Sequence, residues 1–367
     1  MRILVHGLVG TNLGGIETFL LNMNEAMSDE CIFDYVIEES KCMHEARIHK
    51  KGGKIYHITS RRKNVKQHLR DLKKLYREHK EEYEVIYFNL SSASWILPQL
   101  IGKYMGYRVV IHSHNAMLID ANSNLFYKVV NCVNRFLLGH MKFTRLTCSD
   151  LASKFLFGDG KSIKIYNGIN VEQYKFSSEI RFNIREKYDI AQEAFVIGVI
   201  GRLAYQKNPL FSIEIFNQIL KDRPDSFLFM IGDGKLRQEV MGLTRKYHIE
   251  DHVILTGNIQ NVNEYLNVFD VFMLPSRHEG LGIALIEAQA NGLPCVTSKD
   301  VVPVEAKVSD RVEFVKLEKT SHEWANIILS MNQNMKREEG YYLMKNSLYN
   351  IQIESKKLEN ILIGKCK

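Results

Sequence analysis

The chain has 367 residues, of which 45% are hydrophobic and 25% charged, with a net charge of +7. This length exceeds one ordinary domain and predicts two, and the composition describes a soluble globular protein. The N-terminal segment lacks the apolar core of a signal peptide, and no apolar run reaches the roughly 18 residues of a membrane-spanning helix. The six scattered cysteines include no CxxC pair, so we expect reduced thiols and a cytoplasmic location.

The first half of the chain alternates short apolar segments with longer amphipathic ones. This alternation is typical of α/β domains with a parallel sheet. Helices are expected at 16–27 and 65–80, and the second keeps its apolar residues on one face. The expected strands lie at 2–6, 33–38, 54–57, 85–88 and 108–112.

A second series of the same kind begins at Phe195. The polar segment 167–190 between the two series has weak periodicity and is the expected hinge. We therefore predict α/β domains at 1–168 and 169–344, with a helix at 345–367 that can return to complete the first. The second series is expected to have helices at 209–223, 235–247 and 282–291, and strands at 195–200, 226–232, 252–256, 271–275 and 294–297.

The segment 271–292 carries the strongest chemical signal. Glu279 stands in a loop between a buried strand and a helix, and Glu287 lies eight positions later in that helix. A helix start after a strand offers free amides to a diphosphate, and the two acids can then contact different parts of one extended ligand. The alternative is that Glu279 caps the helix and Glu287 makes a surface ion pair. The loop amides concerned are those of Gly280, Leu281 and Gly282.

Two basic residues follow the strand expected at 195–200. Arg202 and Lys207 can reach a phosphate just outside the sheet, Arg through paired hydrogen bonds and Lys as a point charge. Taken alone, they can equally be solvated surface residues. The sequence has no convincing Asp-x-Asp motif, and two fixed cations can supply the stabilisation that a divalent metal gives elsewhere. We therefore expect no metal and no other cofactor.

The first domain opens with a glycine loop that does not spell the dinucleotide-binding fingerprint. Gly14 and Gly15 precede a helix, where they either offer exposed amides or form a plain tight turn. His112 and His114 follow the strand expected at 108–112, a position where a histidine is often only a polar cap.

The two glutamates, together with the segment Gly201-Arg202-Leu203 and the following Lys207-Asn208, resemble the signature of retaining glycosyltransferases of family GT4. That family has the GT-B fold, in which two Rossmann-like domains face each other across a cleft. The resemblance covers nearly the whole chain and is most specific from 195 to 297. It implies that the second glutamate of the motif binds the ribose hydroxyls of a nucleotide sugar. It also implies that the first glutamate contacts the donor sugar.

Other positions resemble the family more weakly. The loop at Gly14 and Gly15 matches one that borders the acceptor and the donor phosphate. His114 is the better match to a histidine that contacts the donor sugar. Asn167 opens an Asn-Gly linker motif with Asn170 where the family has Asp, and a bare turn explains it equally well. The glycines that the resemblance places near the nucleotide are Gly201, Gly232 and Gly257.

The resemblance implies a retaining hexosyltransferase, closest to the EpsF-like branch, which builds exopolysaccharide or capsule. The donor is a nucleoside diphosphate sugar, with a UDP-sugar favoured, and the acceptor is a glycan or a polyprenyl-diphosphate-linked glycan. Same-face attack is expected, with Arg202, Lys207 and the 280–282 amides stabilising the departing diphosphate while Glu279 and His114 hold the sugar. A UDP-sugar 2-epimerase and a non-catalytic nucleotide-sugar-binding protein are the alternatives.

Basic residues concentrate in the segment 41–80, which contains fourteen lysines and arginines but only three acidic residues. Attraction to an anionic membrane surface that carries a lipid diphosphate acceptor is the favoured interpretation, and a merely solvated face is the alternative. No base-reading motif accompanies the charge, so nucleic acid is not an expected partner.

Overall fold

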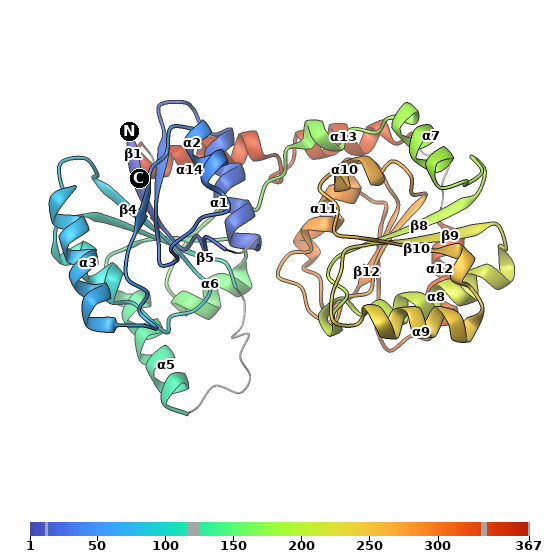
Figure 1. The fold of residues 1–367 in the computed structure, drawn as a ribbon, viewed down its shortest axis with the longest axis horizontal. Helices are drawn as coiled ribbons and strands as arrows, with labels where there is room; N and C mark the ends of the chain where they lie inside the picture. Colours follow the sequence, from blue (N-terminus) through green and yellow to red (C-terminus); the bar gives the residue numbers. More distant parts are fainter. Residues whose placement is uncertain (12–13, 116–124, 332–335, 366–367) are drawn as a thin grey trace. The chain divides into compact units, whose positions relative to one another are not determined.

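The computed structural model describes residues 1–11, 14–115, 125–331 and 336–365, which form two compact units (Figure 1). The first unit comprises Met1–Gly168 together with Ile351–Lys367, and the second comprises Ile169–Asn350. Within the described residues, none of the helices combines the length and the apolar character needed to cross a bilayer.

The first unit is built on a parallel sheet that has seven strands in the described residues, in the order β3-β2-β1-β4-β5-β6-β7. The order reverses between β1 and β4, and such a switch point leaves the carboxyl ends of the two strands open to a ligand. The strands are β1 (Arg2–His6), β2 (Ile32–Ile37), β3 (Ile55–His57), β4 (Val85–Leu90), β5 (Arg108–Ser113), β6 (Thr144–Thr147) and β7 (Ile163–Lys164).

Helices cover both faces of this sheet, which explains why its central strands are apolar on both sides. Apolar residues of α1, α2 and α14 pack on one face, and those of α3, α5 and α6 pack on the other. The helices are α1 (Gly15–Ala26), α2 (Glu45–Lys50), α3 (Val65–Glu78), α4 (Leu97–Tyr104), α5 (Leu125–His140), α6 (Asp150–Phe157) and α14 (Ile351–Leu362).

The second unit repeats the plan with a parallel sheet of six described strands, in the order β10-β9-β8-β11-β12-β13. Here the order reverses between β8 and β11, which pair directly. Both units are therefore Rossmann-like, as the sequence predicts. The strands are β8 (Phe195–Ile200), β9 (Ser226–Ile231), β10 (Val253–Gly257), β11 (Val271–Leu274), β12 (Cys295–Ser298) and β13 (Val312–Val315).

One face of this second sheet packs against α8, α9 and α12, whose apolar residues share one core cluster with the strands. Four short 3-10 turns are described, η1 (Val171–Tyr174), η2 (Tyr205–Lys207), η3 (Glu250–His252) and η4 (Val304–Ala306). The helices are α7 (Ser178–Lys187), α8 (Pro209–Asp222), α9 (Arg237–Tyr247), α10 (Val262–Tyr265), α11 (Ile283–Ala290), α12 (Ser321–Ser330) and α13 (Glu338–Lys345).

The C-terminal segment differs from its prediction. Residues 345–367 were expected to form one helix that returns to the first domain, but α13 ends at Lys345, and the first unit resumes only at Ile351, where α14 begins. The connection between them is held in the second unit, because the hydroxyl of Tyr349 donates to the carbonyl of Glu305 at 2.8 Å. Residues 345–350 therefore belong to the second unit.

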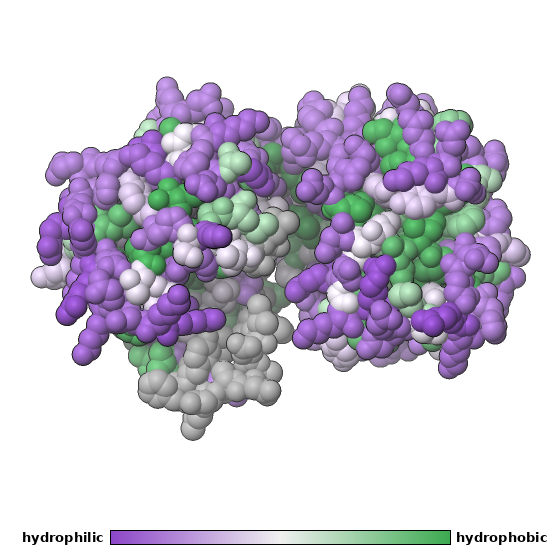
Figure 2. Space-filling view, in the orientation of Figure 1, coloured by the Kyte–Doolittle hydropathy of each residue, from purple (hydrophilic) through white to green (hydrophobic). Residues whose placement is uncertain are grey.

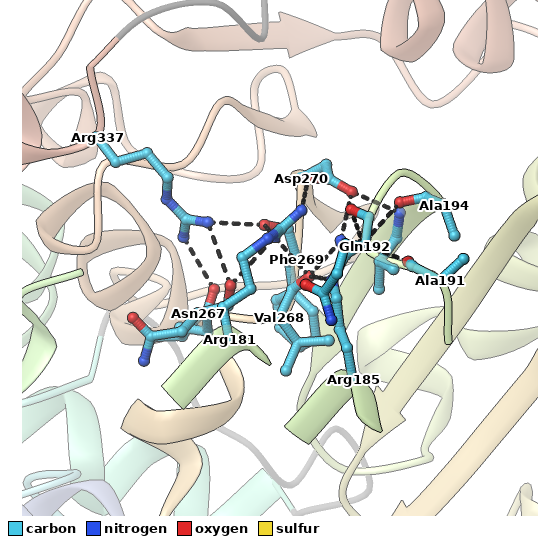
Figure 3. A network of polar contacts seen from close by, with 12 residues as sticks. Arg181, Arg185, Ala191, Gln192, Ala194, Asn267, Val268, Phe269, Asp270 and Arg337 are labelled. Atoms are coloured by element: carbon cyan, nitrogen blue, oxygen red, sulfur yellow. Dashed lines mark hydrogen bonds and ion pairs between the residues drawn. The ribbon is translucent and has the colours of Figure 1, made fainter. Parts of the chain in front are cut away.

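Three arginines bind the segment 266–270, which leads into β11 (Figure 3). Arg181 and Arg185 of α7 both donate to the carboxylate of Asp270, at 2.7 and 2.8 Å. Arg337 donates to backbone carbonyls of the same segment. Helix α7 lies within the polar segment that was expected to be a hinge. These bonds instead fix it to the second unit, so the prediction was wrong for that part of the segment.

Replacing Arg185 with Ala is expected to lower the free energy of unfolding of the second unit by about 3–5 kcal/mol. Arg185 is 0% exposed, and its loss removes one of the two donors to an oxygen of the partly buried Asp270 carboxylate together with the donor to the carbonyls of residues 191, 192 and 194. Urea unfolding followed by Trp324 fluorescence, in a Trp95→Phe background, measures the loss.

Lys319→Ala is the matched control for this measurement. It removes the exposed ion pair between Lys319 and Glu323, which solvent screens, so a much smaller loss is expected. Equal losses in the two variants would contradict a special role of the buried arginine.

Candidate functional site

The loops that follow β8 and β11 meet where the strand order of the second sheet reverses. The first loop carries Lys207 in η2, and the second carries Glu279 ahead of α11. The backbone N–H of Arg277 donates to the carbonyl of Gln206 at 2.7 Å, so the two loops are bonded to each other. The structure thus brings the two parts of the predicted donor site together within one domain.

Lys207 and Glu279 form an ion pair, with 2.6 Å between Nζ and Oε1. The hydroxyl of Ser276 donates to the same oxygen at 2.6 Å, and the glutamate side chain is only 6% exposed. The lysine stem passes over Gly201, where a Cβ would lie 3.1 Å from two of its carbons. Gly201 also has a φ of +152°, so both space and backbone conformation favour glycine there.

Glu287 lies within α11 and accepts a hydrogen bond from the hydroxyl of Tyr174, at 2.8 Å. Burial raises the pKa of Glu287 to about 7, while the Tyr174 hydrogen bond and the charge of Lys207 oppose the rise. Lys207 therefore acts electrostatically on Glu287 while it is bonded to Glu279. The two glutamates of the motif share one cation.

The start of α11 is open to an anion. Among the described residues no side chain caps this helix, whose N-cap is Gly282 with a φ of +78°. A Cβ at Gly280 would meet nothing within 4 Å, whereas the Leu281 side chain is buried. Uncapped amides at a helix start favour phosphate groups. Arg202 is exposed, and the structure does not bring its side chain into contact with the Lys207–Glu279 pair.

Glycines hold the neighbouring loops of the second domain close together. The N–H of Gly232 donates to the carbonyl of Gly257 at 2.9 Å. A Cβ at Gly232 would lie 2.2 Å from the carbonyl oxygen of Gly201, so no other residue fits. These three predicted positions therefore gather at the carboxyl ends of β8, β9 and β10.

The predicted residues of the first domain line a pocket of about 940 Å³ near the switch point between β1 and β4. Gly14, Gly15, His114 and Asn167 all belong to its lining. His112 does not, because it is buried and bonded through Nδ1 to the hydroxyl of Tyr87 at 2.6 Å.

His114 presents a neutral imidazole to this pocket. Burial lowers its pKa to about 3, and its Nε2 bonds to the amide oxygen of Asn89 at 2.8 Å. Because that oxygen accepts, Nε2 carries the hydrogen and Nδ1 offers a lone pair. The imidazole can therefore accept a hydrogen bond from a hydroxyl.

The glycine loop differs in part from its prediction. The N–H of Gly14 donates to the carboxylate of Glu17 at 3.0 Å, so this amide is not free for a phosphate. The same carboxylate accepts from the N–H of Val9 at 3.3 Å and closes the loop on α1. Gly15 has open space where a Cβ would be, and positions 12–13 of the loop lie outside the described residues.

Residues 180–341 match the protein family described as "Glycosyl transferases group 1". The matched range holds the Lys207–Glu279 pair, Glu287 and the open start of α11. The chain therefore contains a group 1 glycosyltransferase domain. This confirms the family that the glutamate motif predicts for this part of the chain.

Two relatives illustrate the likeness of this glycosyltransferase to known proteins. The putative glycosyltransferase EpsF of Bacillus subtilis is 27% identical over 81% of this chain and 79% of that protein. The UDP-Gal:alpha-D-GlcNAc-diphosphoundecaprenol alpha-1,3-galactosyltransferase of Escherichia coli is 30% identical over 60% of this chain and 58% of that protein.

Solved structures confirm the fold of the glycosyltransferase. Anabaena Alr3699/HepE in complex with UDP has a TM-score of 0.82 and 18% identity over 99% of this chain and 100% of that one. WaaG, a glycosyltransferase involved in lipopolysaccharide biosynthesis, has a TM-score of 0.71 and 14% identity over 99% and 100%. The glycosyltransferase therefore has the GT-B fold.

Two residues that hold the glutamates of the candidate donor site were not predicted. Ser276 directly follows a buried strand, and its position before Glu279 is a signal that could have identified it. Tyr174 reaches Glu287 from 113 positions earlier in the chain, and no local pattern marks it. Ser276 donates a hydrogen bond to one oxygen of Glu279, and Tyr174 donates one to an oxygen of Glu287.

Proposed function

We propose that the chain is a retaining glycosyltransferase that moves a sugar from a UDP-sugar to a glycan or lipid-linked glycan acceptor. The proposal rests on the ion pair between Lys207 and Glu279 beside the uncapped start of α11. The names of the relatives support it, since one uses UDP-Gal and a diphosphoundecaprenol acceptor and another serves Vi polysaccharide biosynthesis. The product would then be a bacterial-type exopolysaccharide or capsule, built on the cytoplasmic side of the cell membrane.

The donor diphosphate would lie against the start of α11, where the amides of residues 280–282 and the charge of Lys207 can stabilise it. Arg202 is exposed at the end of β8 and would add a second cation. Two fixed cations and a helix start suit a leaving diphosphate, so we propose transfer without a divalent metal. Glu287, next to this site, would accept hydrogen bonds from the ribose hydroxyls.

Glu279 would contact the donor sugar rather than attack it. Its Oε1 already accepts from Lys207 and Ser276, and in the described part of the chain its Oε2 accepts no hydrogen bond. A carboxylate held in this way can receive a sugar hydroxyl and can stabilise an oxocarbenium-like transition state. An acceptor hydroxyl then attacks the anomeric carbon on the same face from which the diphosphate departs, so the anomeric configuration is retained. A phosphate oxygen of the departing diphosphate takes the proton of that hydroxyl.

Replacing Glu287 with Gln is expected to raise the Kd for UDP by about 10- to 100-fold, because hydrogen bonds to a charged group contribute about 1.5–3 kcal/mol. In the unsubstituted chain the Kd should fall about tenfold as the pH rises through the pKa of Glu287, which is about 7, since the carboxylate is the stronger acceptor. Calorimetric titration with UDP measures both effects.

The Glu287→Gln variant also separates the titration of Glu287 from that of UDP. The titration of UDP affects the Kd of the variant and of the unsubstituted chain equally, whereas the titration of Glu287 affects only the unsubstituted chain. Glu239→Gln, at an exposed glutamate of α9, is the matched control and should leave the Kd unchanged. An unchanged Kd in the Glu287 variant would remove this residue from the ribose site.

Turnover separates transfer from the two alternatives that the sequence raises. With a UDP-sugar and a lipid-linked glycan acceptor, we expect a glycosylated acceptor whose anomeric configuration equals that of the donor, as measured by NMR. UDP-N-acetylglucosamine incubated alone should not be epimerised. An epimerised product without acceptor would favour the 2-epimerase, and binding without any turnover would favour a regulatory protein.

We also propose that the enzyme works at an anionic membrane surface through the basic segment 41–80. Several cations there have acidic partners within the first domain, among them Arg47 and Lys54. The outer face of α3 keeps a row of exposed cations without ion pairs among the described residues. On the same side of the sheet, α5 exposes apolar side chains. The cations are Lys66, Arg70, Lys73 and Arg77, and the apolar residues are Val129, Val133 and Phe136.

Replacing Lys66, Arg70 and Lys73 together with Gln is expected to lower partitioning onto phosphatidylglycerol-containing vesicles by about 100-fold, because each nearby cation contributes about 1 kcal/mol. Vesicle sedimentation at low and high salt measures this. A control variant with Gln at Lys187, Lys246 and Lys316 has the same net charge and should still bind. Binding that ignores salt, or that is equal on neutral vesicles, would contradict the proposal.

A further inference from the structure

Tyr174 of η1 is held at its backbone and at its side chain by the end of α11. The side-chain amide of Asn291, which directly follows this helix, donates to the carbonyl of Tyr174 at 2.9 Å. The hydroxyl of Tyr174 donates to Oε1 of Glu287 at 2.8 Å. Asn291 and Glu287 are four positions apart, so they lie on the same side of the helix. Because its backbone is tied down beside the carboxylate, the tyrosine keeps its hydroxyl on Glu287 at a small cost in entropy.

Asn291, which anchors the tyrosine, is itself fixed. It is 0% exposed, and its amide nitrogen also donates to Oδ1 of Asn267 at 3.1 Å. Its side-chain oxygen accepts a hydrogen bond from Arg337. Both polar atoms of the Asn291 amide are therefore bonded, and the amide cannot turn away from Tyr174 without breaking buried hydrogen bonds.

Helix α13 also holds η1. The hydroxyl of Tyr341 donates to the carboxylate of Glu172 at 2.6 Å, and Lys345 forms an ion pair with the same carboxylate at 3.2 Å. The second unit begins at Ile169, and η1 is the first helical element that follows. The segment by which the chain enters the second unit is thus bonded both to α13 and to the helix that carries Glu287.

The contact with Tyr174 leaves one oxygen of Glu287 for a ligand. Oε1 is occupied by the tyrosine hydroxyl, whereas Oε2 accepts no hydrogen bond from the part of the chain that the structure describes. Glu287 is partly exposed, and the structure does not enclose this oxygen. A carboxylate oxygen has two lone pairs, so Oε2 can accept from two neighbouring hydroxyls at once.

A hydrogen-bond donor at Oε1 also favours the charged form of the acid. Burial raises the pKa of Glu287 to about 7, whereas the Tyr174 hydrogen bond and the charge of Lys207 lower it. Helix α13 and strands β11 and β12 also pack against α11, but none of their described groups acts on this pKa. Without the tyrosine hydroxyl, less Glu287 would be ionised at neutral pH.

We propose that Tyr174 is a positioning residue of the candidate donor site. It holds one oxygen of Glu287 and leaves the other to the ribose of the donor, so that a single oxygen accepts from both neighbouring ribose hydroxyls. This inference rests on the proposed ribose role of Glu287 and adds a residue that acts on the nucleotide only through that glutamate. It also makes η1, where the chain enters the second unit, part of the nucleotide site.

Tyr174→Phe removes the hydroxyl and keeps the ring. The Kd for UDP at neutral pH should rise about tenfold, because Glu287 loses its orientation and is less ionised. The carboxylate is the stronger acceptor, so the Kd is lower above the pKa of Glu287 than below it. Loss of the tyrosine hydrogen bond raises that pKa, and the fall in Kd should therefore move up by about one pH unit. Calorimetric titration with UDP over a pH series measures both effects, and Glu287→Gln supplies the titration of UDP itself.

A double-mutant cycle separates positioning from a general loss of stability. In the Glu287→Gln background, Tyr174→Phe should change the Kd less than about twofold, because no carboxylate remains to be oriented or kept ionised. Tyr188→Phe is the matched control. It removes a hydroxyl that bonds to the hydroxyl of Tyr265 at 3.1 Å in the same unit, and should leave the Kd and its pH dependence unchanged. Circular dichroism shows whether each variant is folded.

The unsubstituted chain tests the same geometry without a mutation. 2′-Deoxy-UDP and 3′-deoxy-UDP should each bind about tenfold more weakly than UDP above the pKa of Glu287, because Oε2 accepts from both hydroxyls. Binding of either analogue as tight as that of UDP would overturn the single-oxygen geometry, even if the tyrosine variant fails to fold.

The variants also distinguish the role of Tyr174 from that of Glu287. A Tyr174→Phe chain that binds UDP as tightly as the unsubstituted chain would overturn the positioning role. So would an equal loss of affinity in both backgrounds with no shift in pH dependence, which indicates a merely structural tyrosine. An unchanged Kd in Glu287→Gln would refute the ribose role in the proposed function. If Glu287→Gln weakens UDP binding and Tyr174→Phe does not, only the role of Tyr174 fails.

Discussion

The reversal of strand order between β8 and β11 is the constraint on which the candidate donor site depends. The chain leaves these adjacent strands toward the separate helices α8 and α11, and the two loops that follow the strands meet at this point. Lys207 from one loop and Glu279 from the other form an ion pair there. The same lysine lowers the cost of a second carboxylate, Glu287, beside the first. A single cation thus allows two acids to occupy one edge of a sheet.

Hydropathy alone could predict most of the fold, because parallel strands covered on both faces appear as short apolar runs. Strands at the margins were missed where this signal is weak. β6 contains Arg145, β7 has only two residues, and β13 exposes Glu313. The break between α13 and α14 was also missed, because apolar residues continue across it. A tertiary contact decides that break, namely the hydrogen bond from Tyr349 to a carbonyl of the second unit.

The surface in Figure 2 is mostly hydrophilic on both units, as the composition suggests.

The position of a candidate site residue was predictable where that residue follows a strand end closely, as Glu279, Lys207 and His114 do. It was not predictable where a partner comes from a distant segment, as Tyr174 does. Gly14 shows a third limit, because its amide was expected to be free and is instead bonded to a carboxylate three residues later. Sequence spacing identifies which groups can meet a ligand, but only packing decides which of them are already occupied.

The return of α14 to the first domain has a consequence for the order in which the protein is made. Leu358, Ile361 and Leu362 of this last helix belong to the same core cluster as Ile3 and Val5 of the first strand. A ribosome therefore releases every residue of the second domain before the first domain can close its core. The N-terminal domain, although synthesised first, is the later one to mature, and it must remain incomplete while its neighbour folds.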